Sequence, residues 1–566
     1  MEMKAAEALV RLLQEEGVDV IFGYPGGAVL PLYDALYGQK IRHVLVRQEQ
    51  GGAHAANGYA RATGKIGVCI GTSGPGATNL VTGIANAFAD SIPMLIITGQ
   101  VHTQLVGSDA FQEVDITGIT IPITKHNYLI KKAQDLPKVI KQAMLIASTG
   151  RPGPVLVDIP KDVQETVITY SNPKEVRPQG YKPTFKGNSK QIIQAAKAIL
   201  TAERPLIFAG GGVIAAEASE ELLKLAETIQ APVVNTLMSI GTFPRSHPLS
   251  LGMLGMHGAK YANLAVTECD VLIGLGVRFD DRATGKVSGF APNAKIIHVD
   301  IDPAEVGKNV RFDIPIVGDV KVIIQELLNH LAATKHPVWL KRIEQLKVEY
   351  PLVLQAEKGC QWAQLHPWQV LQKLQQLTKG DAIVTTDVGQ HQMWAAQHYL
   401  ANRPRTFISS GGLGTMGYGF PAAVGAQLGC PDQQVICITG DGSFQMSMQE
   451  FGTAVEQKLP IKVIILNNHQ LGMVRQLQEF YCEERYFGVD YTGAPDFAMF
   501  AQCYGAAGFR ITKPEELESV LTQALNTPGP VIVDCTVCGR ENIYPMVLGG
   551  TSIDEAIVDR GRGEKA

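Results

Sequence analysis

An aspartate set between two glycines, followed further on by a pair of asparagines, marks a possible site for a metal ion and a phosphate. Asp441 stands in the GDG that follows the apolar run VICIT, and Asn467 and Asn468 follow the apolar run IKVIIL. If both runs are neighbouring strands of a parallel sheet, these side chains meet at its carboxyl edge, where such folds bind ligands. Mg²⁺ favours one or two protein oxygens together with substrate phosphates. Either motif alone is an ordinary turn or loop, but together they lead us to expect that Asp441, an amide oxygen at Asn468 and a main-chain carbonyl near Gln470 hold a pyrophosphate through Mg²⁺.

A second acid, Glu49, stands where an apolar strand gives way to small residues that can open a helix. A glutamate in this position is usually only solvated. However, Val46 before it and residues 51–56 after it are mostly apolar or small, and a general acid needs such surroundings to hold its proton. Glu49 is therefore a candidate proton carrier.

The chain is long enough for three ordinary domains, and its composition is that of a globular protein. It has 566 residues, of which 45% are hydrophobic and 18% are charged. The formal net charge of −4 gives no reason to expect nucleic acid or a membrane surface as a partner. The N-terminal segment has no signal or transit pattern, and no apolar run reaches membrane-spanning length. We expect a cytoplasmic protein that binds small molecules.

The nine cysteines are scattered, mostly in apolar runs, as expected of buried thiols in a reducing compartment. Cys535 and Cys538 form a single CxxC. A closed zinc site needs four ligands, and no second pair stands at a suitable spacing. Metal or redox use of this pair is therefore the minor alternative.

Short Val/Ile-rich runs alternate with helical patterns along the whole chain, which is typical of parallel sheets covered by helices. A segment rich in Pro, Lys and Gly, Ser171 to Ser189, and a charged helical segment at about 332–365 interrupt the alternation. Ser189 is placed to cap the helix that follows. We expect an α/β protein of three doubly wound parallel-sheet domains, at 1–170, 189–335 and 366–540, with a C-terminal tail at 541–566.

The first and third domains look like copies of one another. RPGPVLVDIP at 151–160 recurs as TPGPVIVDCT at 527–536, and the strand, glycine turn, helix and strand of 67–99 recur at 435–468. A duplicated domain explains the shared heptapeptide better than the general likeness of doubly wound folds does. Ser73 takes the place of Asp441 in this alignment, so only one copy kept an acid in its turn.

A competing motif lies at Gly412, Gly414 and Gly417, which spell GxGxxG after a strand-like run. This pattern can mark a dinucleotide-binding turn. The acid expected at the end of a second strand about 20 residues later is missing, and the loop GCPDQQ occupies its place. A dinucleotide at this turn is therefore the weaker hypothesis.

Taken together, the motifs resemble the catalytic subunits of the biosynthetic acetolactate synthases (acetohydroxyacid synthases), a family of thiamin-diphosphate-dependent enzymes. The resemblance covers nearly the whole chain and rests on FGYPGGAVLPLYDAL, QEQGGAHAANGYARATGK, SGPGATNLVTGIANA, GRPGPVLVDIPKDV, GMLGMHG, VRFDDR, SSGGLGTMGYGFPAA, GDGSF and LNN. It implies the decarboxylating condensation of two pyruvates to 2-acetolactate, or of pyruvate and 2-ketobutyrate to 2-aceto-2-hydroxybutyrate, in branched-chain amino-acid biosynthesis. It also implies thiamin diphosphate, Mg²⁺ and a structural, non-redox FAD as cofactors.

The resemblance assigns the three domains to the thiamin pyrimidine, the FAD and the diphosphate, in chain order. It makes Glu49 the activating acid that reaches the cofactor of a neighbouring subunit, and so implies a homodimer or tetramer with active sites at the subunit interface. The family often adds a small regulatory subunit. The residues implied near the reacting centre are Gly27, Phe111, Gln112 and Lys161. Those implied for thiamin diphosphate are Val388, Gly389, Gln390, His391, Gly414, Met416, Gly442, Ser443 and Met473, with Asp441, Asn468 and Gln470 as metal ligands.

Segments of the middle domain match the FAD-binding segments of the family. Arginines suit a pyrophosphate and an acid suits a hydroxyl group, whereas the glycines at 210–212 alone fit an empty domain equally well. The shorter catabolic acetolactate synthases lack these segments, which favours a biosynthetic enzyme. The implied FAD residues are Arg151, Gly210, Gly211, Gly212, Thr236, Leu237, Gly255, Met256, His257, Gly276, Arg278, Asp280, Arg282, Asp300, Ile301, Asp319 and Val320.

Leu477 departs from the family pattern, which usually has a tryptophan at this place in the substrate pocket. In the family that ring narrows the pocket for the second substrate and favours 2-ketobutyrate over pyruvate. We therefore expect weaker discrimination between the two, and weaker binding of sulfonylurea-type inhibitors, which stack on the ring. The tail reads YPMVLGGTS where relatives often carry prolines, which weakens its expected role as a lid.

Two other functions compete with this one. A pyruvate oxidase that uses flavin would pass electrons to an acceptor instead of releasing acetolactate. A catalytically silent nucleotide-binding protein would need no proton carrier, and Glu49 argues against it.

Overall fold

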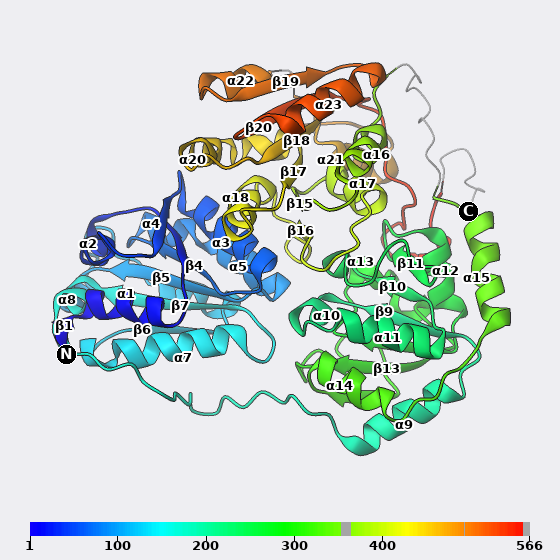
Figure 1. Cartoon of the computed structure of the whole chain (residues 1–566), viewed down its shortest axis with the longest axis horizontal. Coiled ribbons are helices and arrows are strands. Elements are labelled where there is room, and N and C mark those ends of the chain that lie inside the picture. The colour runs from blue at the N-terminus through cyan, green and yellow to red at the C-terminus, as the bar shows by residue number, and fades with distance from the viewer. Residues whose placement is uncertain (353–363, 492, 559–566) are drawn as a thin grey trace.

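The computed structural model describes residues 1–352, 364–491 and 493–558. These residues form three α/β units, each built on a six-stranded parallel sheet covered by helices (Figure 1). In Figure 1 the first unit lies on the left, the third lies above, and the middle unit lies at the lower right. The predicted fold class is confirmed.

The first unit has the strand order β3-β2-β4-β5-β7-β6. Its central strands β4, β5 and β7 are buried along their whole length, which is why they read as continuous apolar runs. The strands are β2 (Val20–Gly23), β3 (Arg42–Leu45), β4 (Gly67–Gly71), β5 (Met94–Gln100), β6 (His126–Leu129) and β7 (Pro154–Pro160), with an antiparallel pair β1 (Glu2–Lys4) and β8 (Val167–Thr169) beside them. The helices are α1 (Ala5–Glu15), α2 (Leu30–Leu36), α3 (Glu49–Thr63), α4 (Pro75–Asn79), α5 (Val81–Asp90), α6 (Ile116–Thr120), α7 (Leu136–Ser148) and α8 (Lys161–Glu165).

The middle unit has the order β11-β10-β9-β12-β13-β14, in which the direction of winding reverses between β9 and β12. Such a reversal opens a crevice at the carboxyl ends of the two strands. The strands are β9 (Pro205–Ala209), β10 (Val233–Asn235), β11 (Ser250–Met253), β12 (Val271–Leu275), β13 (Lys295–Asp300) and β14 (Ile314–Val317). The helices are α9 (Ser189–Leu200), α10 (Gly211–Ala215), α11 (Ser219–Ile229), α12 (Lys260–Glu268), α13 (Asp281–Thr284), α14 (Val320–Leu328) and α15 (Pro337–Glu349).

The third unit has the order β16-β15-β17-β18-β20-β19. The strands are β15 (Ile383–Thr386), β16 (Phe407–Ser409), β17 (Val435–Gly440), β18 (Lys462–Asn467), β19 (Ala507–Ile511) and β20 (Val531–Thr536). The helices are α16 (Pro367–Thr378), α17 (Gln390–His398), α18 (Gly419–Gly429), α19 (Asp441–Gln445), α20 (Phe451–Glu456), α21 (Gly472–Tyr481), α22 (Phe497–Cys503) and α23 (Leu517–Asn526). Matched in chain order, its strands repeat the arrangement of β2 to β7, so the predicted likeness of the first and third units is confirmed in their topology.

Helices α3 and α18 join the first and third units at very close range. A Cβ atom added to Gly58 would lie 2.1 Å from the main-chain oxygen of Ala422, and one added to Gly425 would lie 1.8 Å from that of Ala55. Ala55 and Gly58 have the same spacing on α3 as Ala422 and Gly425 have on α18. The two helices therefore cross symmetrically, and one apolar core, to which Tyr59 and Phe420 belong, extends across the crossing.

The connection between the first and middle units, residues 171–188, runs as extended chain along the bottom of Figure 1. The predicted cap by Ser189 is wrong in detail. Ser189 is the first residue of α9, and the side chain of Asn188 accepts hydrogen bonds from the amides of Lys190 and Gln191 at 3.0 and 3.4 Å. Asn188 has the extended backbone of an N-cap residue, from which its side-chain oxygen reaches the amides of the second and third residues of the helix.

The C-terminal tail leaves the third unit and packs on the middle unit. Val547, Ile553 and Ala556 enter an apolar core of the middle unit, and Asn263 of α12 donates a hydrogen bond to the main-chain oxygen of Ile553 at 3.0 Å. The tail therefore connects the two units.

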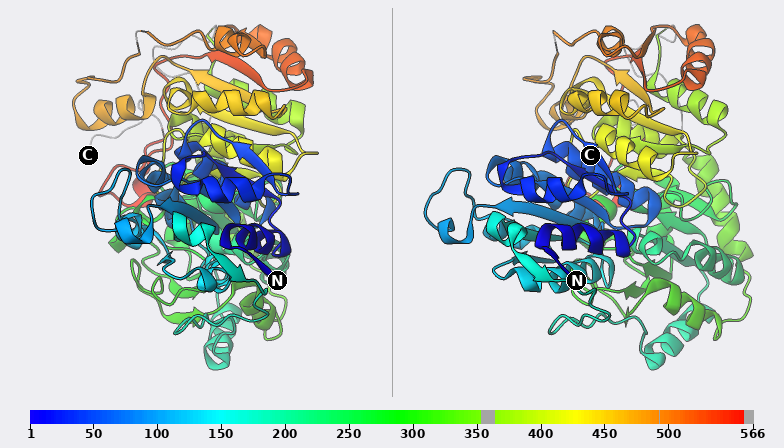
Figure 2. Two further views of the ribbon diagram at one scale, coloured as in Figure 1. Left: turned by 90° about the vertical axis from the view of Figure 1, so that its left-hand side faces the viewer. Right: turned by 60° about the vertical axis from the view of Figure 1, so that its left-hand side comes forward.

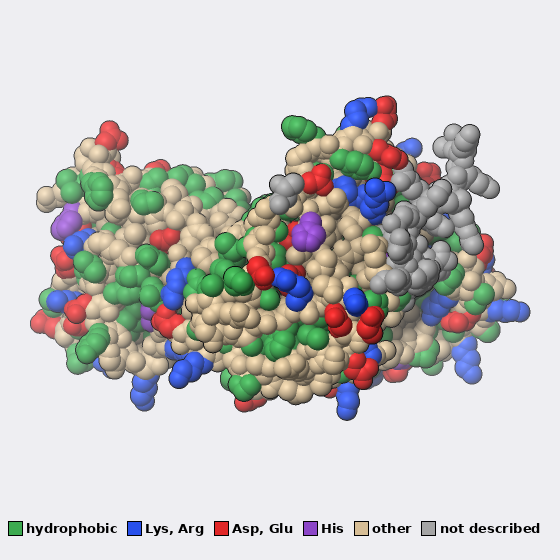
Figure 3. Space-filling model, turned by 90° about the horizontal axis from the view of Figure 1, so that it is seen from above, with side chains coloured by type: hydrophobic (Ala, Val, Ile, Leu, Met, Phe, Trp, Pro, Cys, Tyr) green, Lys and Arg blue, Asp and Glu red, His purple; other side chains and the backbone are tan. Residues whose placement is uncertain are grey.

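The surface seen from above carries acidic and basic side chains side by side, with no extended region of one sign (Figure 3). Within the described ranges, the helices are all too short or too polar to cross a bilayer. Both views of Figure 2 show the segment between β5 and β6, in light blue, projecting from the body of the molecule.

Candidate active site

A small pocket of about 50 Å³ lies at the carboxyl edge of the third sheet, where the turns after β15, β17 and β18 meet. Most residues that the resemblance implies for thiamin diphosphate and Mg²⁺ lie together in its wall: Val388, Gly389, Gln390, His391, Met416, Asp441, Gly442, Ser443, Asn468, Gln470 and Met473. Gly414 is outside the wall, next to Val388. Trp394, Leu471 and Val474 also line the pocket and were not expected from the sequence.

Oxygen atoms without hydrogen-bond partners point to a cation site in this pocket. Asp441 begins α19 and is 1% exposed, and its Oδ2 has no partner. The side-chain oxygen of Gln470 has none either, while Oδ1 of Asn468 accepts from the amide of Gln470 at 3.1 Å. Burial raises the pKa of Asp441 to about 7, against the main-chain amides that lower it. A carboxylate and amide oxygens are hard ligands, so these residues fit Mg²⁺.

His391 lines the pocket, and two glycines leave room for its ring. Cβ atoms added to Gly389 and Gly440 would lie 2.9 and 2.8 Å from its ring. Burial lowers the pKa of His391 to about 3, so the ring is neutral, and its Nε2 has no partner. A neutral ring nitrogen beside the start of α17 suits a phosphate oxygen.

Asp387, which sequence reasoning missed, fixes the turns that form the pocket. It follows β15 and is fully buried, and it accepts hydrogen bonds from the amides of Val388, Gly417 and Gly419 at 2.9, 2.8 and 3.1 Å. Burial raises its pKa to about 6. The signal was available, because Asp387 ends its strand as Asp441 does.

Glu49 lies at the carboxyl edge of the first sheet, as the first residue of α3. Its side chain is nearly buried, at 7% exposed, and Oε2 accepts from the side chain of Asn79 at 2.9 Å. A Cβ atom on Gly76 would lie 3.1 Å from Oε1, so this glycine leaves the carboxyl its space. Val46 and residues 51–56 are buried around it, as the sequence led us to expect.

The other residues implied near the reacting centre gather around the same edge. The turn that holds Gly27 is hydrogen-bonded to the turn after β4 and to α8. The amide of Ala28 donates to Thr72 at 3.3 Å, and the side chain of Gln164 on α8 donates to the main-chain oxygen of Ala28 at 2.8 Å. Lys161 begins α8. The backbone of Gln112 packs against Gly74, in the turn after β4, with φ of +60°. Phe111 stands out of the surface, 88% exposed, in the projecting segment of Figure 2.

The two groups of residues do not meet within one chain. Glu49 is not in the wall of the pocket that contains Asp441. In Figure 1 α2 and α4, beside the first group, lie on the left of the molecule, and α17 and α21, beside the pocket, lie on the right. Each chain therefore carries two separate candidate half-sites, one around Glu49 and one around Asp441.

A larger cavity of about 360 Å³ lies mainly between the first and middle units, at the point where the winding of the middle sheet reverses, and Arg405, Phe407 and Ile408 of the third unit complete its wall. The size is within the usual range for small-molecule sites. Its wall contains Arg151, Gly210, Gly211, Gly212, Thr236, Gly276, Arg278, Asp280, Asp300, Ile301, Asp319 and Val320 from the residues implied for FAD. Leu237, Gly255, Met256, His257 and Arg282 are not in the wall; four of them cluster beside the tail, with the amide of Met256 donating to the oxygen of Arg282 at 2.8 Å.

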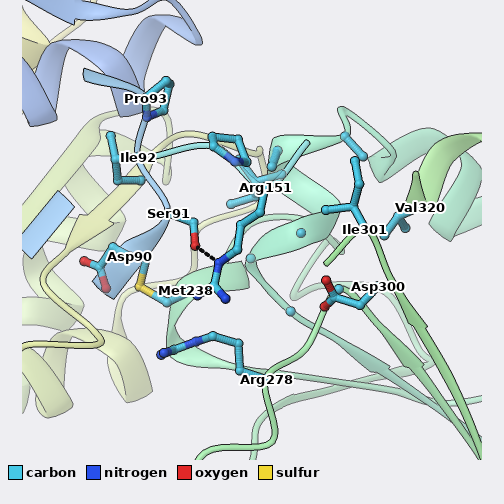
Figure 4. A pocket seen from close by; sticks show the side chains of 18 of the residues that line it. Asp90, Ser91, Ile92, Pro93, Arg151, Met238, Arg278, Asp300, Ile301 and Val320 are labelled. Carbon is cyan, nitrogen blue, oxygen red and sulfur yellow. Dashed lines mark hydrogen bonds between the residues drawn. The ribbon is translucent and has the colours of Figure 1, made fainter. Parts of the chain in front are cut away.

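Charged groups enter this cavity from both sides. Figure 4 shows Arg151 reaching in from the first unit, toward Arg278 and Asp300 of the middle unit. Arg151 donates to Ser91 at 2.8 Å and pairs with Glu305 at 2.7 Å. Burial raises the pKa of Asp300 to about 7. The cavity therefore offers guanidinium groups and a buried acid, as a pyrophosphate and a hydroxyl group require.

The close approach of two glycine turns shapes the cavity floor. A Cβ atom on Gly210 would lie 2.2 Å from the oxygen of Gly276, and one on Gly212 would lie 2.6 Å from its Cα. No larger residue fits at these positions without moving the backbone. The glycines at 210–212 thus serve packing of the strand ends as well as any ligand.

The GxGxxG turn uses its amides inside the protein. Gly411 and Gly412 donate to the buried carboxylate of Asp90 at 3.2 and 2.6 Å, and Arg61 pairs with Asp90 at 3.5 Å. These amides are not available to a phosphate, which argues against a dinucleotide at this turn. Asp90 and Arg61 also line the larger cavity, and sequence reasoning missed both.

Comparison with protein families gives three matches along the chain. Residues 3–119 match the thiamine pyrophosphate enzyme N-terminal TPP binding domain, residues 192–327 the central domain, and residues 387–535 the C-terminal TPP binding domain. A probable acetolactate synthase large subunit of Methanocaldococcus jannaschii is 52% identical over 97% of this chain and 94% of its own length. The acetolactate synthase large subunit of Haemophilus influenzae is 47% identical over 100% of this chain and 99% of its own. The chain belongs to the acetolactate synthase family of thiamine pyrophosphate enzymes.

The residue that departs from the acetolactate synthase family pattern, Leu477, lies on α21 one turn after Val474, which lines the pocket. Leu477 itself is half-buried. The residue before it on α21, Gln476, is bound to the tail: it donates to the oxygen of Ile543 at 3.0 Å and accepts from its amide at 2.9 Å. Gln390 of the pocket donates to Gln476 at 3.0 Å, so tail, helix and pocket form one network.

The two cysteines of the CxxC in this acetolactate synthase family member differ in state. Cys535 is buried in β20, and burial raises the pKa of its thiol. Among the residues that the structure describes, no group of three or more His, Cys, Asp or Glu side chains converges on a common point. Cys535 is a free thiol, whereas Cys538 is disulfide-bonded, so the two cysteines of the motif are not bonded to each other.

Proposed function

We propose that this chain is the catalytic subunit of an acetolactate synthase. It would join two pyruvates to 2-acetolactate with release of one CO₂, or pyruvate and 2-ketobutyrate to 2-aceto-2-hydroxybutyrate, for branched-chain amino-acid synthesis. The observation that carries the proposal is identity of about half of all residues, over nearly the whole chain, with proteins named acetolactate synthase large subunits.

The third unit, within 366–540, would hold the diphosphate. Asp441, Asn468 and Gln470 supply the oxygens for Mg²⁺, and His391 and the amides at the start of α17 face the phosphate. Met416 lies in the same wall, and its side chain would support the thiamin ring. Thiamin diphosphate supplies an electron sink for loss of CO₂ and for the new carbon–carbon bond.

The first unit, within 1–170, would supply the proton carrier. Glu49 is nearly buried and its Oε2 accepts from Asn79, so its carboxyl is held in one place, as a general acid or base requires. Because it lies away from the pocket of its own chain, we propose that it serves the pocket of a second chain. The working enzyme is then at least a homodimer, with Gly27, Phe111, Gln112 and Lys161 facing the substrate at the interface.

The larger cavity, whose middle-unit wall belongs to 189–335, would hold FAD. Arg151 and Arg278 suit its pyrophosphate, and Asp300 suits a hydroxyl group. Formation of acetolactate has no net redox change, so the flavin is a structural group. We also propose a cytoplasmic location and a small regulatory partner, both on the basis of the similarity to the acetolactate synthase family.

The test is conversion of pyruvate by the purified chain with thiamin diphosphate and Mg²⁺. We expect acetolactate, measured as acetoin after acid decarboxylation, and a large loss of rate in Glu49→Gln. Glu456→Gln, an exposed acid that pairs with Arg47, is the matched control and should keep its rate. Reduction of an electron acceptor without acetolactate would indicate a pyruvate oxidase instead, and no turnover of pyruvate would indicate a silent binding protein.

A further inference from the structure

A buried acid of the third unit holds the start of the helix that carries Glu49. Glu450, directly before α20, is 2% exposed. Its carboxylate accepts from the amide of Arg47 at 2.9 and 3.1 Å and from the amide of Gln48 at 3.0 Å. Thr453 donates to the same carboxylate at 2.9 Å. The carboxylate therefore has partners on both of its oxygens.

The helix start needs this acid because it has no cap of its own. Gln48 is the N-cap residue of α3, and its side chain makes no capping hydrogen bond. In many helices an acid three residues into the helix accepts the amide of the N-cap residue. Here that position is Gly51, and Glu450 from a distant part of the chain takes over the role.

Gly51 is what lets Glu450 approach. A Cβ atom on Gly51 would lie 2.4 Å from Oε1 of Glu450 and 2.7 Å from its Cδ. The missing side chain and the incoming carboxylate thus form a matched pair across the boundary between the two units.

We propose that Glu450 is a positioning residue for Glu49, which rests on the proposed function in which Glu49 is the proton carrier. The two amides held by Glu450 belong to the residues directly before Glu49, so they fix the backbone from which its side chain extends. Misplacement of a reacting group by about 1 Å can cost roughly 100-fold in rate. The third unit of each chain then has two roles. It forms the diphosphate pocket of its own chain, and it positions Glu49, which serves the diphosphate pocket of a second chain.

The first test measures amide hydrogen exchange in the cofactor-free protein, for peptides that contain Arg47 and Gln48. Glu450→Ala removes both acceptors and should expose these amides to exchange. Glu450→Gln keeps one oxygen that can accept both amides, so protection should return. Glu456→Ala, which loses a pair with the side chain of the same Arg47, should leave protection unchanged.

The second test measures hydrogen–deuterium exchange at the thiazolium C2 of bound thiamin diphosphate, by acid quench and NMR. We expect Glu450→Ala to slow it by about tenfold or more while cofactor affinity stays the same. Gly51→Ala should have the same effect, because it displaces the carboxylate but keeps its charge and favours the helix. It also covers the case in which Glu450→Ala fails to fold. Glu450→Gln should stay within roughly threefold of the wild type, since a neutral acceptor replaces a charged one.

Combination with Glu49→Gln separates this proposal from the proposed function. If Glu450 acts through Glu49, Glu450→Ala should add little to the loss already caused by Glu49→Gln. An equal further loss, or wild-type exchange in both Glu450→Ala and Gly51→Ala, would overturn the positioning role. Wild-type exchange in Glu49→Gln alone would overturn the proton carrier itself, and with it anything that positions it.

Discussion

Replacement of Gly425 by alanine tests whether the crossing of α3 and α18 sets the geometry of both half-sites. The added Cβ atom would lie 1.8 Å from the main-chain oxygen of Ala55, which cannot rotate away. Ordinary carbon–oxygen contact needs well over 3 Å, so the helices must move apart by more than 1 Å. Helix α3 begins with Glu49, and α18 follows the turn that contains Met416, so both would shift.

Two opposing effects decide the stability of this variant. Alanine is better than glycine in a helix by about 1 kcal/mol. Overpacking a close contact costs about 1–3 kcal/mol, and a clash with backbone should reach the upper end. The expected net loss is about 2 kcal/mol, which lowers the unfolding temperature by roughly 4–8 °C for a unit of this size. Acetolactate formation should fall further than the folded fraction does, because the half-sites move.

Thermal unfolding by circular dichroism and steady-state rates with pyruvate measure the two effects. Gly452→Ala is the control, since its added atom would meet only side-chain atoms, at 3.1 Å or more. A Gly425→Ala protein as stable and as active as the wild type would refute the claim that this helix contact is set by backbone proximity.

Three other predictions follow from the sites. Asp441→Asn should weaken Mg²⁺-dependent binding of thiamin diphosphate by more than about 100-fold, because loss of a direct ligand costs more than loss of a residue that only orients a ligand. Calorimetric titration measures the affinity, and an unchanged Mg²⁺ requirement would contradict the ligand role. Asp158, buried in β7, has its pKa raised by burial to about 7. Below about pH 4 this carboxyl is protonated in both the folded and the unfolded state and costs no stability, whereas between about pH 4 and pH 7 its burial destabilises the folded state progressively. The unfolding temperature of cofactor-free Asp158→Asn should therefore rise relative to that of the wild type between about pH 5 and pH 7.5. A difference in unfolding temperature that does not change with pH would contradict this. Leu477→Trp should shift the product ratio toward 2-aceto-2-hydroxybutyrate by roughly tenfold when pyruvate and 2-ketobutyrate compete at equal concentration; a constant ratio would show that this side chain does not touch the acceptor.

The sequence was sufficient to place a residue where its position depends only on one strand and on the turn that follows that strand. Strands buried on both faces, such as β4 and β17, read as unbroken apolar runs, and the acids and amides at their ends could be placed on one sheet edge before any coordinates. Asp441 and Asn468 come together for this reason. Asp387 obeys the same rule and could have been found by it.

The sequence was insufficient where a contact joins distant parts of the chain. Glu450 meets Arg47, and Asp90 meets Gly412, across more than 300 residues, and neither pairing leaves a local pattern. The tail is a similar case, because Ile553 binds Asn263 through its main-chain oxygen, which any residue provides. The sequence analysis placed the cap of α9 at Ser189, whereas the backbone geometry makes the preceding residue, Asn188, the cap.

The symmetric crossing of α3 and α18 has a consequence for the history of the chain. Before the two units were joined, two identical small proteins would have packed against each other through this helix. Every substitution would then have occurred twice in the pair, once on each side of the twofold axis between them. Fusion removed that constraint for the rest of the surface, so the two copies could diverge, and Asp441 stands in one turn where Ser73 stands in the other. At the axis itself the steric demand stayed the same on both sides, and Gly58 and Gly425 still record it.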